Sequence, residues 1–228
     1  MSAAIPSKIK LTYFDIDGVA EKVRICLRTA SPAPIPFEDV RVAFPEFAAL
    51  KPTLPNGQLP IMQIDDGPVM TQSAGMFRWA GRLSGHMPQD PMEQLKVEEI
   101  MGLVEDMAKE ISPSLYITRK PEDFGHFGVA PEKLTEFQLK LRANIAAPGS
   151  AFHKVAANLE KKLEGSTSGW FCGDKPTCAD IEMFVRMHWL KKGVLDGIPT
   201  DIWSTYPNLE KMFAQMAAIP GAILPKKA

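Results

Sequence analysis

The sequence contains little cysteine, no excess of charge and no long apolar run. Its three cysteines, Cys26, Cys172 and Cys178, lack the paired spacing of a zinc site or a redox CxxC motif, so we expect reduced thiols. The 26 lysines and arginines nearly balance the 27 aspartates and glutamates, and no block of like charge could follow a phosphate backbone. We therefore expect neither nucleic acid nor a membrane as a partner.

Signals for export, membrane insertion and metal binding are also missing. No apolar run approaches the roughly 18 residues that a membrane helix needs. Residues 1–7 lack the basic and apolar regions of a secretory signal, so we expect a cytoplasmic protein. The 4 histidines show no metal-ligand spacing, and we expect no metal requirement.

What the sequence does contain is an alternation of strand and helix patterns in its first 84 residues. Residues 8–14 alternate as a strand does, and apolar residues then recur at helical spacing up to residue 30. Further strands are predicted at 37–42 and 58–64, with a short helix at 44–50 and a longer helix that has Ser73 as its N-cap.

Strand signals nearly stop after this point. Residues 85–91 have the composition of a linker, and the apolar stripe of residues 92–116, which includes Leu95, predicts a long helix. Shorter helices are expected at 131–144, 152–163, 181–190 and 208–218, with Thr177 and Asp180 forming a capping box for the third of these. The predicted fold class is an α/β domain at 1–84, a linker at 85–91 and an all-helical domain at 92–228.

Three short motifs, in their order and spacing, carry a family resemblance. They are Lys10-Leu-Thr-Tyr-Phe14 followed by Gly18 and Ala20-Glu21, then Thr53-Leu-Pro-Asn-Gly-Gln-Leu-Pro60, then Thr71-Gln-Ser73. With them, the chain resembles a cytosolic glutathione transferase over nearly its whole length, closest to the sigma class. The resemblance implies a thioredoxin-like first domain, a helical bundle as the second domain, and a homodimer.

Tyr13 is the candidate catalytic residue, because the resemblance implies that its hydroxyl donates a hydrogen bond to the sulfur of glutathione. Donation to the charged form favours that form, so the thiol pKa would fall from about 8.5. The pattern alone also allows a structural role for Tyr13, as a cross-strand aromatic on a half-buried sheet face.

The resemblance also implies a binding site for glutathione as co-substrate. A cis peptide bond before Pro60 would present the Leu59 backbone to the cysteinyl part, Ser73 would hold the γ-glutamyl carboxylate, and Lys51 would pair with the glycine carboxylate. Lys51 could instead be only a solvated lysine, and Asp106 only an exposed helix acid. The full expected set is Phe47, Lys51, Gln58, Leu59, Pro60, Gln72, Ser73 and, from the partner subunit, Asp106.

Two residues depart from the sigma-class pattern. Phe47 replaces a tryptophan and so lacks an N–H donor, and Val19 replaces an arginine that helps to arrange the surroundings of the tyrosine. The loss of this arginine makes the expected pocket for small hydrophobic electrophiles more apolar. Its expected walls are Phe14, Val19, Met107 and Ile111, of which the last two lie one helical turn apart.

The function expected from these residues is conjugation of glutathione to a hydrophobic electrophile, without a metal. One alternative is a prostaglandin-type isomerase that regenerates glutathione. An alternative of another class is a non-catalytic binding or structural protein that retains the fold, as some lens proteins do.

Overall fold

The first part of the chain forms a four-stranded mixed sheet with two helices on one face. The computed structural model describes residues 5–223. In the sheet, order β2-β1-β3-β4, strand β1 pairs parallel with β2 and antiparallel with β3, which pairs antiparallel with β4. The elements are β1 (Ile9–Phe14), α1 (Glu21–Arg28), β2 (Glu38–Val42), α2 (Phe47–Leu50), β3 (Ile61–Ile64), β4 (Val69–Met70) and α3 (Ser73–Ser84).

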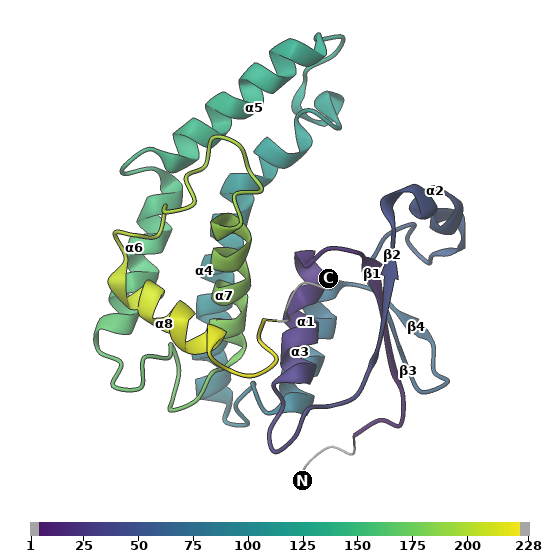
Figure 1. Cartoon of the computed structure of the whole chain (residues 1–228), viewed down its shortest axis with the longest axis vertical. Helices are drawn as coiled ribbons and strands as arrows, with labels where there is room; N and C mark the ends of the chain where they lie inside the picture. Colours follow the sequence, from purple (N-terminus) through teal and green to yellow (C-terminus); the bar gives the residue numbers. More distant parts are fainter. Residues whose placement is uncertain (1–4, 224–228) are drawn as a thin grey trace.

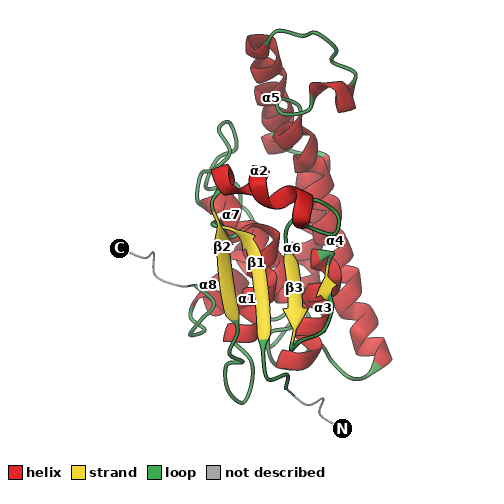
Figure 2. Ribbon diagram, turned by 90° about the vertical axis from the view of Figure 1, so that its right-hand side faces the viewer, coloured by secondary structure: helices red, strands yellow, loops and turns green. Residues whose placement is uncertain are grey.

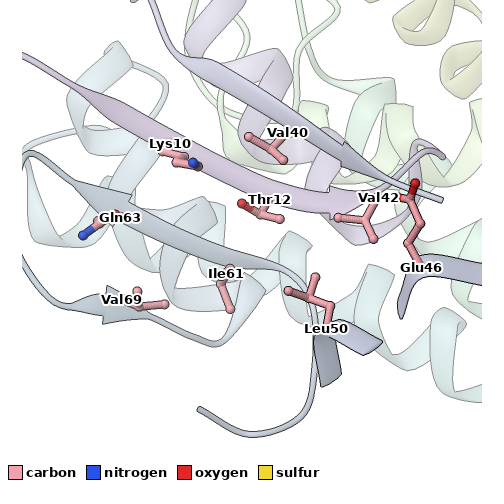
Figure 3. A pocket seen from close by; sticks show the side chains of 9 residues that line it. All are labelled: Lys10, Thr12, Val40, Val42, Glu46, Leu50, Ile61, Gln63 and Val69. Carbon is pink, nitrogen blue, oxygen red and sulfur yellow. The ribbon is translucent and has the colours of Figure 1, made fainter. Parts of the chain in front are cut away.

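Alternation along β1 separates the two faces of the sheet. Ile9, Leu11 and Tyr13 are buried in the core, which α1 and α3 complete. On the outer face of the sheet, α2 lies across one end of the strands (Figure 2). A groove of about 490 Å³ follows this outer face, and Figure 3 shows its lining: Lys10, Thr12, Val40, Val42, Glu46, Leu50, Ile61, Gln63 and Val69.

All later elements are helical. Residues 85–90 connect α3 to α4, the longest helix, which packs against α5, α6 and α7. Helix α7 also packs against α1, so the two parts of the chain meet along these helices (Figure 1). The expected α/β unit followed by a helical unit is therefore confirmed. The helices are α4 (Pro91–Tyr116), α5 (Pro131–Ala146), α6 (Ala151–Glu164), α7 (Cys178–Lys191) and α8 (Pro207–Ala217).

Several local expectations differ from the structure. Gln72, not Ser73, occupies the N-cap position of α3, because the Gln72 carbonyl accepts from the Met76 amide at 3.1 Å. The third strand begins only after Pro60, since proline has no N–H for the ladder. Leu95 is 59% exposed because it lies about 200° around α4 from buried Val97.

The start of α7 is held by a buried carboxylate, as the predicted capping box requires. Asp180 is fully buried and accepts from the backbone amides of Thr177 at 2.8 Å and Phe171 at 2.9 Å. The Thr177 hydroxyl donates to the same carboxylate at 2.9 Å. Asp180 therefore joins the loop before α7 to the first turn of the helix.

Removal of this carboxylate should destabilise the protein. Asp180→Ala leaves one buried and one partly buried amide without an acceptor, at a cost of about 3 kcal/mol in the free energy of unfolding. Urea denaturation measures the loss. Asp174→Ala, in the exposed part of the same loop, is the control and should change the midpoint little. Equal stability of the two variants would show that Asp180 does not support the helix.

Candidate functional site

Two cavities meet beside the end of β1. A small polar pocket of about 110 Å³ lies between the segment before β3 and the start of α3. A larger cleft of about 520 Å³ lies between the end of β1, the end of α4 and one face of α7. Val19 lines both cavities, and Tyr13 lines the larger one. A molecule that occupies both cavities would therefore pass the Tyr13 region.

Tyr13 reaches this position because the next turn leaves room for its ring. Gly18 has a φ of +47°, which favours glycine. A Cβ atom at Gly18 would lie 2.6 Å from the Tyr13 hydroxyl and from Cε1 of the ring. Gly18 is therefore required for the close approach of this turn to the phenol, a role that its turn motif did not reveal.

Arg24 of α1 holds the turn that follows β1 through hydrogen bonds to its backbone. Its guanidinium, 0% exposed, donates to the Ile16 carbonyl at 3.0 Å and to the Asp17 carbonyl at 3.1 Å. It also pairs with Asp39 of β2 at 2.9 Å, and it lies 5.8 Å from the centroid of the Tyr13 ring. The same side chain therefore positions the turn and faces the phenol.

The Tyr13 hydroxyl is held in its protonated form. Burial raises its pKa above the ordinary value of 10.0, against smaller opposing effects of the Val19 amide and the Arg24 charge. At neutral pH the side chain is consequently a neutral O–H group that can donate a hydrogen bond. It is not a phenolate base.

The small pocket brings together most of the residues expected to bind glutathione. The peptide bond before Pro60 is cis, as expected. The first turn of α3 borders the pocket with no side chain capping its amides, and Gln72 has a φ of +73° there. Such amides form a ready anion site. The lining is Val19, Asn56, Gln58, Leu59, Pro60, Thr71, Gln72 and Ser73.

Three residues of the expected set lie outside this pocket. Lys51 is exposed, and its side chain passes within 3.4 Å of where a Cβ at Gly57 would lie, next to the pocket segment. Phe47 lines neither cavity and packs edge-on to Phe14, with 4.9 Å between ring centroids. Asp106 is exposed on α4 and pairs with Lys109 at 2.8 Å.

Two of the four residues expected as walls of the electrophile pocket line the large cleft, and two do not. Phe14 and Val19 line the large cleft, but Met107 and Ile111 are 0% exposed and belong to the core. Their stripe of α4 faces the neighbouring helices, so the helix reaches the cleft only at its end, through Leu115 and Tyr116.

The other wall of the cleft comes from α7, which sequence reasoning assigned to the bundle alone. Phe184, Val185, Arg186 and Trp189 line it. The only signal for this role was the presence of charged residues and a tryptophan on a helix otherwise built for the core. The packing of α7 against α1 decides which of these side chains face the cleft.

Residues 5–223 contain no cluster of three or more histidine, cysteine, aspartate or glutamate side chains that could hold a metal ion. Over the same residues, no helix has the length and apolar character needed to cross a membrane.

Comparisons with known proteins find relatives that are similar in sequence and in fold. A family model described as "Glutathione S-transferase, C-terminal domain" matches residues 142–222. Glutathione S-transferase 1 of Ascaris suum is 34% identical over 75% of this chain and 75% of its own length. The crystal structure of the glutathione S-transferase from Ascaris lumbricoides covers 94% of each chain at 30% identity and a TM-score of 0.70. A Necator americanus glutathione S-transferase described as monomeric covers 94% of each chain at 26% identity and the same TM-score of 0.70.

The ionisation of Tyr13 can be measured directly. We expect the midpoint of its phenolate absorbance near 295 nm to lie above pH 10, because burial opposes the charged form. The Tyr13 component is the difference between the titration curves of the unmodified protein and Tyr13→Phe, which cancels the other two tyrosines. A midpoint below pH 10 for the Tyr13 component would contradict a pKa raised by burial.

Proposed function

This chain belongs to the glutathione S-transferase family, and we propose that it joins the sulfur of glutathione to small hydrophobic electrophiles, with Tyr13 as the catalytic residue. The observation that carries the proposal is the position of Tyr13 beside Val19, where the polar pocket and the large cleft meet. Glutathione bound in the pocket would supply a thiol at this junction. The cleft would hold the electrophile.

The role of Tyr13 follows from its protonated state. A neutral phenol donates a hydrogen bond to the sulfur, and this bond is stronger when the sulfur is a thiolate. A fall of two units in the thiol pKa corresponds to about 2.7 kcal/mol of differential stabilisation. The thiol proton leaves to solvent, a C–S bond forms at the electrophilic carbon, and the leaving group departs with its bonding electrons.

The pocket residues would orient the tripeptide. Ser73 and the first amides of α3 would hold the γ-glutamyl carboxylate, with the side chains of Gln58 and Gln72 beside it. The Leu59 backbone would pair with the cysteinyl part. Lys51, whose side chain packs against Gly57 next to the pocket, would pair with the glycine carboxylate.

Phe47 would contribute through the aromatic cluster that shapes this end of the sheet. Phe14 stacks on Phe44 at 4.8 Å and meets Phe47 edge-on, so Phe47 supports two rings that line the large cleft. Val19, which replaces an arginine of the sigma pattern, adds an apolar contact at the same place. Membership of the sigma-like, tyrosine-type class and a cytoplasmic location remain part of the proposal.

Substitution of Tyr13 tests the mechanism. Tyr13→Phe should raise the pKa of bound glutathione, followed by thiolate absorbance near 240 nm, and lower kcat/KM with 1-chloro-2,4-dinitrobenzene about 10- to 100-fold. Tyr206→Phe, whose hydroxyl pairs with His153 away from both cavities, is the control and should retain the thiol pKa.

Either of two results would overturn this assignment. An unchanged kcat/KM in Tyr13→Phe would show that the Tyr13 hydroxyl takes no part in the reaction. Failure of the unmodified protein to bind immobilised glutathione would favour the alternative of a structural protein.

Homodimer formation with Asp106 completing the partner's site is also part of the proposal. Its support in the structure is that Asp106 is exposed on α4 and has only Lys109 as an ion-pair partner within the described residues. In the proposed dimer the carboxylate would reach the γ-glutamyl ammonium bound by the other subunit.

This arrangement predicts a selective effect on binding. Asp106→Asn should raise the KM for glutathione about three- to tenfold with little change in kcat, since only a charge contact to the substrate is lost. Glu110→Gln, an exposed acid one turn later, is the control. Sedimentation velocity establishes the oligomeric state. A monomer, or equal KM values for the two variants, would contradict this arrangement.

A further inference from the structure

We propose that the large cleft selects electrophiles that carry an anionic group, and that Arg186 of α7 is the receptor for this group. The inference rests on the proposed function and specifies its substrate class. The substrate would combine an apolar or aromatic body, which bears the electrophilic carbon, with a carboxylate or a similar anion.

Arg186 lines the cleft as a partly buried cation without an anionic partner. Its Nε–H group is shielded from solvent and donates no hydrogen bond to any of residues 5–223. Burial lowers the pKa of its guanidinium, against a smaller opposing effect of the Glu182 charge, because burial disfavours the charged form. The guanidinium carbon of Arg186 lies over the ring of Trp189, 5.5 Å from its centroid.

The carboxylates that line the cleft are all engaged by other cations. Glu182, one turn before Arg186, accepts from Lys22 Nζ with both oxygens, at 2.9 and 2.7 Å. Glu21 pairs with Arg24 and Arg28. Asp17 pairs with Lys192. None of the three forms an ion pair with Arg186, although the charge of Glu182, which is already paired with Lys22, favours the charged guanidinium.

The lining as a whole has a surplus of positive charge, although the chain has a formal net charge of −1. Arg119 also lines the cleft and forms no ion pair with the described residues, and it is exposed in the turn that follows α4. His188 adds no charge at neutral pH, because burial lowers its pKa. A bound anion would therefore compensate a cation that the fold leaves unpaired.

The remaining walls suit an apolar body. Phe14, Phe44, Tyr116 and Trp189 all line the cleft, and Phe14 stacks on Phe44. Tyr13 lines the same cavity from β1, whereas Arg186 lines it from α7. A substrate anchored by its anion on α7 would therefore present its other end toward the strand that carries Tyr13.

A matched pair of substrates isolates the charge. 4-Chloro-3,5-dinitrobenzoate and its methyl ester share the same reacting carbon, and only the acid is charged at neutral pH. We expect the unmodified protein to prefer the acid in kcat/KM. Arg186→Gln should reduce this preference about tenfold, which corresponds to about 1.4 kcal/mol, while activity with the ester is largely retained.

Arg82→Gln is the control variant, since it removes one exposed arginine of α3 outside both cavities and should keep the preference. Arg186→Gln should fold at least as stably as the unmodified protein, because a poorly solvated charge is removed. Its thermal midpoint therefore separates a loss of recognition from a loss of structure.

The outcomes distinguish this inference from the proposed function. If the ratio of kcat/KM for the acid to kcat/KM for the ester is the same in the unmodified protein and in Arg186→Gln, Arg186 is not an anion receptor. The proposed conjugation reaction is not affected by that result. If neither substrate is conjugated, calorimetry measures the binding of the unreactive 3,5-dinitrobenzoate to the unmodified protein and to Arg186→Gln, and this comparison tests the anion receptor. Binding that weakens about tenfold in Arg186→Gln supports the receptor, and equal binding or none overturns it.

Discussion

The geometry of the site depends on one buried guanidinium. Arg24 of α1 binds the Ile16 and Asp17 carbonyls, and it pairs with Asp39 on the neighbouring strand. A cation with no exposed surface is stable only if its surroundings supply acceptors, so these contacts determine where the turn after β1 can run. That path places Gly18 against the Tyr13 phenol and Val19 at the junction of the two cavities.

The contact between α1 and α7 brings the two parts of the chain into one site. Lys22 and Glu182 form an ion pair across it, with side chains only 11% and 5% exposed. Because α1 also follows the turn that carries Gly18, this contact sets the position of α7 relative to Tyr13. The α/β unit consequently supplies the polar pocket, and the helical unit supplies much of the wall that an electrophile would meet.

Sequence motifs located the polar pocket better than the large cleft. Gln58, Leu59, Pro60, Gln72 and Ser73 belong to two short segments whose local backbone forms the pocket, so their roles depend on neighbours close in the chain. Met107 and Ile111 were wrongly placed as cleft walls, because helical periodicity shows which residues share a face but not what that face contacts. The same limit concealed Arg186 and Trp189.

The sequence by itself determined the order of strands and helices, the motif that contains Tyr13 and the turn at Gly18, because these features depend on backbone preferences over a few residues. Tertiary structure alone decided which face of α4 is core, which acids are already paired, and that Arg186 is left without an anion in the cleft. Burial and ion pairing join residues far apart in the chain. Lys22 and Glu182, 160 positions apart, show why no local pattern could reveal them.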